Sequence, residues 1–131
     1  MKFTNPSVST QGIVGDLRKR DMSFSQILFQ LIDSKGLIDV DVYKKANIDR
    51  RHFAKLRKKS YRPGKQTVLA LAVALELTIE ETASLLEHAG FSLSPIQEFD
   101  VIVTRYISKG CYDIGKINEA LHKYDQPLLG G

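Results

Sequence analysis

The sequence predicts an all-α protein of seven helices, five in a body formed by residues 23–90 and two in an extension formed by residues 91–131. From residue 23 onward, apolar residues recur every three or four positions, which is the spacing of one helix face. No stretch alternates apolar and polar residues over the length of a strand. The length of 131 residues fits a single domain, preceded by a flexible arm over residues 1–22.

The first three predicted helices cover residues 24–35, 40–45 and 50–59. Ser23 and Gln26 form a capping-box pattern, in which each side chain satisfies a backbone N–H at the start of the helix. Asp39 and Asp49 are expected to cap the second and third helices. Asn47 lies between these two helices and tolerates the left-handed conformation that a tight turn requires.

Four further helices are predicted over residues 66–76, 79–90, 95–108 and 114–124. The first of them is nearly continuous in Ala, Leu and Val, so we expect it to be the buried central helix. Thr78 opens the next helix with a second capping box. Ser94, followed by Pro95, and Asp113 are expected to cap the last two helices. Ile96 is the first residue of the apolar stripe in the helix over residues 95–108.

The composition excludes several classes of protein. Hydrophobic residues make up 43% of the chain, too large a share for a fully disordered protein. The single cysteine, Cys111, has no partner for a disulfide within the chain, so a reducing, cytoplasmic location is expected. The longest apolar run, residues 68–75, is far shorter than the roughly 20 residues that cross a bilayer, and no signal-peptide core precedes it. Neither export nor a membrane partner is therefore expected.

No catalytic or metal-binding pattern stands out, so we expect no enzyme activity, no cofactor and no metal. His52, His88 and His122 lie 36 and 34 residues apart, and no Cys or His pair has the spacing of metal ligands. The sequence contains neither a Gly-rich phosphate loop nor a Gly-x-Ser-x-Gly elbow. Cys111 stands alone in a Gly-Cys-Tyr turn and is expected to be inert.

Positive charge is concentrated in one segment of the chain. The whole chain carries 19 Lys and Arg against 15 Asp and Glu, a net charge of +4. Residues 44–65 hold ten basic residues and one acidic residue, Asp49, so this segment has a formal charge of +9 and the rest of the chain has −5. Such a patch suits a polyanionic partner, and a solvated helix face is the simpler alternative.

The position of this charge favours double-stranded DNA as the partner. On the predicted helix over residues 50–59, Phe53 and Leu56 share one side, which we expect to face the core. Arg51, Lys55 and Lys58 lie on the opposite side. A helix with an apolar inner face and a cationic outer face, second in a pair joined by a tight turn, suits the major groove of DNA.

The outer face supplies the expected DNA contacts. Arg51 is best placed for a bidentate contact with guanine, and Ala54 leaves room for close approach to the bases. Lys55 is expected to contact a base or a phosphate. His52 lies between the two faces, so a contact with DNA and a half-buried contact within the protein are equal alternatives. The residues expected to contact phosphates are Lys44, Lys45, Arg50, Lys58, Lys59, Arg62 and Lys65.

The stretch VYKKANIDRRHFAKLRKKSYRP, followed by TVLALAVALELTIEETASLL, resembles the helix-turn-helix domains of the phage-repressor family, the Cro/Xre-like five-helix fold. The resemblance covers residues 23–90, about half of the chain. The residues that carry it are Val42, Asn47, Ile48, Asp49, Phe53, Leu56, Pro63, Ala72, Leu75, Leu77 and Leu85. It implies a repressor-like helix-turn-helix domain with a two-helix C-terminal extension, and a dimeric, sequence-specific transcriptional regulator that binds double-stranded DNA.

Three residues depart from the pattern of this family. Tyr43 stands where the family usually has a small residue, Asn47 where the turn commonly has Gly, and Arg57 where an acidic residue is frequent. These departures bear on how the domain docks more than on its fold. The extension is also similar to helical C-terminal modules attached to larger bacterial multidomain proteins.

Other functions and arrangements stay open. A protein-binding adaptor or inhibitor would present the same basic face to an acidic or nucleic-acid-processing partner, and an exposed Tyr43 would favour it. RNA binding lacks the aromatic stacking platform that single strands require. The extension is expected either to pack on the body or to form a homodimer interface, through Ile102, Tyr106 and Ile107. Residues 128–131, Leu-Leu-Gly-Gly, are expected to form a frayed tail.

Overall fold

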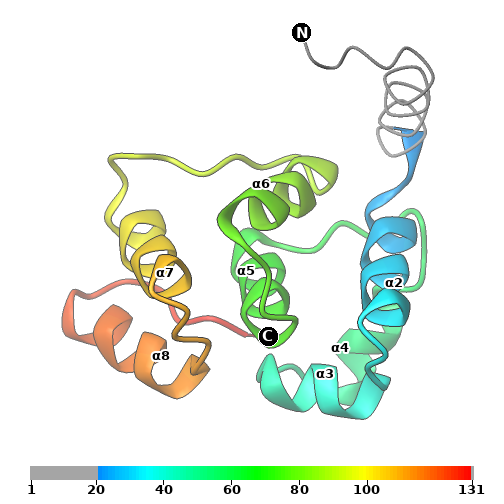
Figure 1. Ribbon diagram of the computed structural model, residues 1–131, viewed down its shortest axis with the longest axis horizontal. Helices are drawn as coiled ribbons and strands as arrows, with labels where there is room; N and C mark the ends of the chain where they lie inside the picture. The colour runs from blue at the N-terminus through cyan, green and yellow to red at the C-terminus, as the bar shows by residue number, and fades with distance from the viewer. Residues whose placement is uncertain (1–20, 131) are drawn as a thin grey trace, which may run out of the picture.

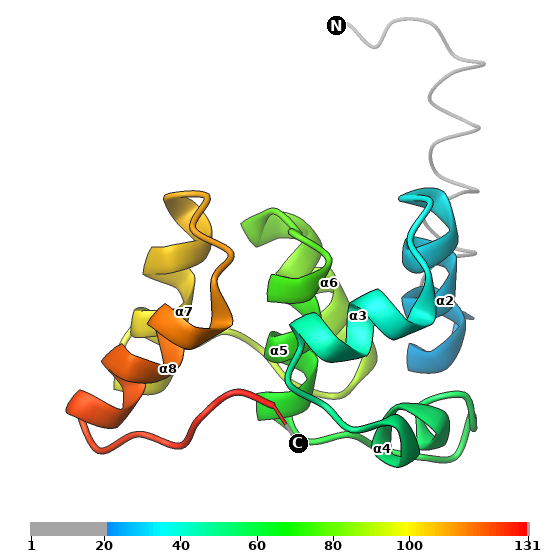
Figure 2. The same ribbon diagram turned by 90° about the horizontal axis from the view of Figure 1, so that it is seen from below.

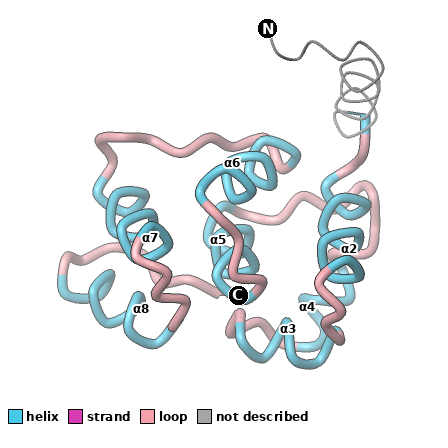
Figure 3. The backbone as a smooth tube through the Cα atoms, in the orientation of Figure 1, coloured by secondary structure: helices cyan, strands magenta, loops and turns pink. Residues whose placement is uncertain are grey.

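The computed structural model describes residues 21–130, which form seven helices and no strand (Figures 1 and 3). The prediction of an all-α fold is confirmed for this part of the chain. The flexible arm was predicted over residues 1–22, and residues 1–20 of it lie outside the described part of the chain. The helices are α2 (Phe24–Ser34), α3 (Asp39–Lys45), α4 (Arg50–Lys55), α5 (Lys65–Ala74), α6 (Ile79–His88), α7 (Glu98–Ser108) and α8 (Ile114–Lys123).

Four helices begin at the capping residues that the sequence predicts. Ser23 and Thr78 each complete a capping box at the start of α2 and α6. Asp49 accepts a hydrogen bond of 2.7 Å from the backbone N–H of His52 at the start of α4. Asp113 caps α8 in the same way. Each of these side chains satisfies a backbone donor that the helix leaves without an intrahelical partner.

The start of α3 differs from the prediction. The residue before the helix is Ile38, whose backbone is extended and whose side chain makes no capping hydrogen bond. Asp39, which we expected to be the cap, lies in the first turn instead. Its carboxylate pairs with the guanidinium of Arg57, which comes from the segment after α4. A partner distant in sequence therefore occupies the carboxylate that local rules assign to capping.

Helix α7 begins three residues later than predicted, at Glu98 instead of Pro95. The hydroxyl of Ser94 accepts hydrogen bonds of 3.2 Å and 3.1 Å from the N–H groups of Ile96 and Gln97. These bonds close a turn before the helix. As a consequence Ile96, which was expected in the apolar stripe, is 87% exposed.

Helix α4 ends at Lys55, whereas the sequence predicts a helix to residue 59. The backbone N–H groups of Arg57 and Lys58 bond to carbonyl oxygens only three residues back, which tightens the chain into turns. The following segment leads to Pro63, which is buried and has no N–H to continue a helix. Lys58 and Lys59 therefore lie on a turn after α4.

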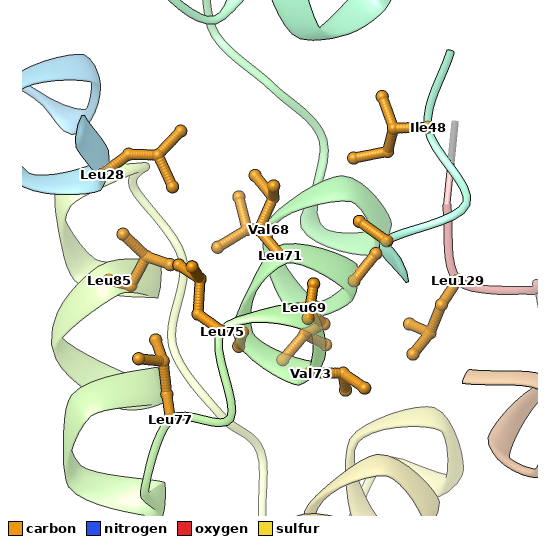
Figure 4. Close-up of a cluster of buried hydrophobic side chains, with 14 of the residues drawn as sticks. Leu28, Ile48, Val68, Leu69, Leu71, Val73, Leu75, Leu77, Leu85 and Leu129 are labelled. Carbon is orange, nitrogen blue, oxygen red and sulfur yellow. The ribbon is translucent and has the colours of Figure 1, made fainter. Parts of the chain in front are cut away.

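Helix α5 is the central helix, as its composition predicts, and Figure 4 shows its side chains at the middle of the core. Every residue from Thr67 to Ala74 is buried. The helix runs from Lys65 to Ala74, not over residues 66–76, because Glu76 adopts a left-handed conformation with φ of 54°. This reverses the chain toward α6, which packs along α5.

The two C-terminal helices pack on the first five. Helix α7 contacts α6, helix α8 contacts α5, and one cluster of buried apolar residues runs from α2 to the end of the described chain. Two hydrogen bonds between residues far apart in sequence also connect the C-terminal extension to the first five helices. The Tyr112 hydroxyl donates a 2.8 Å hydrogen bond to the Leu77 carbonyl, and Lys65 contacts Asp100 at 2.6 Å.

The predicted frayed tail is wrong for residues 128–130. After α8 the chain runs back toward the other helices (Figures 1 and 2). Leu129 is 2% exposed and joins the apolar cluster around α5 (Figure 4). Its N–H and carbonyl both bond to the side-chain amide of Asn118, at 2.8 Å and 3.2 Å. Gly130 then lies so close to Asn47 that a Cβ atom would fall 2.6 Å from its carbonyl oxygen. Burial of one leucine fixes this segment against the turn between α3 and α4.

Candidate nucleic-acid interface

The turn between α3 and α4 is built as the sequence predicts. Asn47 has φ of 57°, the left-handed conformation expected at this position. The N–H of Ile48 bonds to the carbonyl of Tyr43 at 3.0 Å and closes the turn. Ala46 and Ile48, on either side of Asn47, are both buried. The turn therefore holds α4 at a fixed position against the core.

Helix α4 has the two faces that were predicted. Phe53 and Leu56 are buried, and the ring of Phe53 packs against Phe29 and Tyr43 at centroid distances of 5.6 Å and 5.4 Å. Arg51, Ala54 and Lys55 are exposed on the opposite side. Figure 2 shows α4 at the lower edge of the molecule.

Three of the ten basic residues in the segment 44–65 are paired with carboxylates. Arg57 pairs with Asp39, Lys65 with Asp100, and Lys45 with Glu76 at 3.7 Å. The Lys45 pair is well exposed, so it holds the lysine weakly. The remaining seven have no ion pair within residues 21–130 and are exposed: Lys44, Arg50, Arg51, Lys55, Lys58, Lys59 and Arg62.

Lys65 differs from the other predicted phosphate-contacting residues, because its ammonium is engaged inside the protein. It donates to the Asp100 carboxylate at 2.6 Å and to the Ser92 carbonyl at 2.8 Å. Asp100 is fully buried and also accepts a 2.6 Å hydrogen bond from the N–H of Ser94. Lys65 therefore anchors the chain ahead of α7, and we leave it out of the interface. Asp100 is not among the predicted site residues, since nothing near it in the sequence marks it as buried.

His52 makes the contact within the protein that was one of its two predicted roles. Its Nε2 lies 3.2 Å from the hydroxyl of Tyr61, and the two rings meet edge to face. His52 is half-buried, between the buried and exposed sides of α4. The contact orients the imidazole along the loop after α4.

Two residues that depart from the family pattern help to position α4. Tyr43 is half-buried and packs on Phe53, so its ring lies between α3 and α4. The guanidinium of Arg57 lies 4.2 Å from the centroid of the Phe29 ring and pairs with Asp39. Arg57 thereby links the segment after α4 to both α2 and α3. The sequence marks both residues as departures from the family pattern, but it does not predict these contacts.

The predicted homodimer residues have different surroundings. Ile107 is 3% exposed and lies in the core of its own chain. Ile102 and Tyr106 are half-buried and line a surface groove between α7 and α8. Any interface through this part of the chain therefore excludes Ile107.

The described residues contain no group of three His, Cys, Asp or Glu side chains arranged to hold a metal ion. Between residues 21 and 130, no helix is long and apolar enough to cross a membrane. Burial raises the pKa of the Tyr112 hydroxyl, and the carboxylates of Glu76 and Glu81 raise it further. Tyr112 lies in the extension, away from α4.

Comparison with protein-family models, with curated proteins and with solved structures found no match to this chain.

Proposed function

We propose that the protein is a sequence-specific transcriptional regulator that binds double-stranded DNA. In this proposal α2 to α6 form a Cro/Xre-like helix-turn-helix domain, and α7 and α8 are its C-terminal extension. Helix α4 enters the major groove, with Arg51, Ala54 and Lys55 facing the base edges.

One observation carries the proposal. Arg51 and Lys55 are exposed, lie one turn apart on α4 and have no ion pair within residues 21–130, directly opposite the buried Phe53 and Leu56. An arginine held on a rigid helix with its donors free is the commonest reader of guanine. The simpler alternative is a solvated helix face without a binding partner. Such a face would tolerate the same charges, but it would not require the buried turn that fixes the position of α4.

The state of Tyr43 favours DNA over a protein partner on this face. An exposed Tyr43 next to the cations would offer an aromatic anchor of the kind that protein interfaces favour. Instead the ring packs on Phe53 and leaves a surface of cations around Ala54. Such a surface suits phosphates and base edges.

The phosphate contacts in this proposal come from residues that flank α4 on both sides. They position the domain without reading sequence. Because half-sites in such complexes are related by two-fold symmetry, we propose that the protein binds as a homodimer. The flanking residues are Lys44, Lys45, Arg50, Lys58, Lys59 and Arg62.

Selection from a random duplex pool, followed by fluorescence anisotropy across a salt series, tests the proposal. We expect the wild-type chain to enrich one site and to bind it with an affinity that falls steeply with salt. The double variant Arg51→Ala/Lys55→Ala is expected to bind that site at least about 30-fold more weakly, because good base contacts contribute about 1–3 kcal/mol each. Its affinity for random duplex should change much less.

A matched control is the double variant Lys116→Ala/Lys123→Ala, which also removes two exposed positive charges but from α8. We expect it to keep the enriched site and nearly the wild-type affinity. Two results would refute the proposal: equal losses in the two double variants, or an enriched site that Arg51→Ala/Lys55→Ala still binds normally. Binding that is weak and blind to sequence would point to a protein partner for α4.

A further inference from the structure

A groove of about 550 Å³ runs between α7 and α8, apart from the face of α4. Figures 1 and 2 show α7 and α8 side by side toward one end of the molecule, with α4 toward the other end. The two helices turn Val103, Ile107, Ile117 and Leu121 into the core. Their neighbouring positions therefore face outward and form the walls of the groove.

The floor of the groove is apolar and aromatic. Ile102 and Tyr106 lie one turn apart on α7, and Ala120 and Tyr124 face them from α8 and its end. Tyr124 is 50% exposed, and the other three are half-buried. Two tyrosines on a concave surface offer large contact area at low cost in conformational entropy, and such residues dominate binding energy at protein interfaces.

The rim of the groove is cationic. Arg105 and Lys109 stand on the α7 side, Lys116 and Lys123 on the α8 side, and the single carboxylate among the lining residues is that of Glu119. None of the four cations has an ion pair within residues 21–130. Cations that flank an apolar floor on both sides are complementary to a segment with an apolar stripe between rows of carboxylates.

The exposure of the lining residues favours a polypeptide segment over a small molecule as the occupant of the groove. Pockets for small ligands bury most of the ligand and aim a few fixed polar groups at it. Here every lining residue is half-buried or exposed, so no buried polar group points into the groove. A phosphate backbone would use the rim but would leave Ile102 and Ala120 without a partner.

We propose that the α7/α8 groove is a docking site for an acidic amphipathic helix of a partner protein. The helix lays apolar residues at positions i, i+3 or i+4 and i+7 on the tyrosine floor. Its flanking Glu or Asp side chains pair with Arg105 and Lys109 on one side and with Lys116 and Lys123 on the other. Because the groove and α4 lie toward opposite ends of the molecule, one molecule binds this partner and DNA at the same time.

Selection from a helical peptide library tests the proposal. The library keeps leucine at the i, i+3, i+4 and i+7 anchors and varies the flanking positions among Glu, Gln and Lys. It is selected on the immobilised full-length chain. We expect enrichment of Glu at the flanking positions. Enrichment of Lys, or no preference among the three, would overturn the proposal.

Anisotropy titrations of the enriched peptide then locate its binding site. We expect Lys116→Ala/Lys123→Ala to weaken binding about tenfold, since each exposed ion pair contributes up to a factor of about five. Tyr106→Ala should also weaken binding, whereas Arg51→Ala/Lys55→Ala should leave it unchanged. A loss confined to Arg51→Ala/Lys55→Ala would refute the groove as the site, and circular dichroism checks that each variant keeps its helices.

Two other ligands of the groove, a nucleic acid and a second copy of this chain, would each give a distinct result that overturns the proposal. If a single-stranded oligonucleotide binds at the groove and displaces the peptide, the ligand is nucleic acid. If the wild-type chain sediments as a dimer and Lys116→Ala/Lys123→Ala as a monomer, the groove binds a second copy. The outcome of the DNA selection does not enter either result, so this proposal and the proposed function fail independently.

Discussion

Replacing Lys65 with methionine removes the cation that faces the buried carboxylate of Asp100. Asp100 is fully buried, whereas the Lys65 side chain is 21% exposed. One carboxylate oxygen, Oδ2, accepts from both Lys65 and Ser94 at 2.6 Å. The other, Oδ1, is buried with no hydrogen-bond partner within the described residues. Lys65 is therefore the main compensation for a charge that has no access to water.

The expected cost of Lys65→Met follows from these surroundings. Removing one member of a buried ion pair typically lowers the free energy of unfolding by about 3–5 kcal/mol, because the remaining charge is left uncompensated. The partial exposure of Lys65 places this case near the lower end, at about 3 kcal/mol. Asp100→Asn should cost less, about 1.5–3 kcal/mol, since the freed ammonium can reach solvent and the amide oxygen still accepts from Ser94.

Urea unfolding followed by circular dichroism measures these differences by linear extrapolation. The double variant Lys65→Met/Asp100→Asn decides the physical cause. If uncompensated charge is the main cost of Lys65→Met, neutralising Asp100 as well should recover part of the lost free energy. A Lys65→Met variant within about 0.5 kcal/mol of wild type would refute the reasoning. So would single effects that simply add in the double variant.

Three further substitutions test other features. Gly130→Ala should lower the free energy of unfolding by about 1–3 kcal/mol, because its φ of 114° strains any other residue and the new Cβ would lie 2.6 Å from the Asn47 carbonyl oxygen; an unchanged urea midpoint would contradict this. Thr82→Val should raise the same free energy by about 1 kcal/mol, because the hydroxyl of Thr82 is buried without a hydrogen-bond partner among the described residues; destabilisation would show that the hydroxyl is satisfied. Tyr112→Phe should cost about 1 kcal/mol at neutral pH, through the lost hydrogen bond to Leu77. Folding raises the pKa of Tyr112, so the free energy of unfolding of the wild-type chain should fall as the pH rises above about 10. This fall should be shallower in Tyr112→Phe. Equal slopes of the free energy of unfolding against pH in the two proteins, between about pH 9 and 11, would contradict this expectation.

Local rules account for most of the secondary structure. The predicted caps at Ser23, Asp49, Thr78 and Asp113 all form, because a capping side chain bonds to a backbone N–H only three residues away. The left-handed turn at Asn47 is equally local. The two faces of α4 follow from helix geometry once the helix is placed. For these features the interacting groups are neighbours in the sequence, so the sequence contains the whole interaction.

Two of the errors arise where a partner distant in sequence engages a side chain that local rules assign to another role. Asp39 pairs with Arg57, 18 residues away, and another residue precedes α3. In the sequence, nothing distinguishes Lys65 from the other lysines of the basic segment. Its partner Asp100 lies 35 residues away and is brought to it only by folding. The cationic segment is evident from the sequence, but the tertiary contacts determine which of its cations have no ion pair within residues 21–130.

The sequence by itself determined that this chain is helical, where most helices begin, and that positive charge collects on the outer side of α4. Those properties depend on spacings of three or four residues. Only the tertiary structure decided that Leu129 is buried beside α5, that Asn118 holds it there, and that Tyr106 faces α8 across a cationic groove. Each of these depends on packing between segments that the chain brings together only on folding, and no short-range pattern encodes which surfaces will meet.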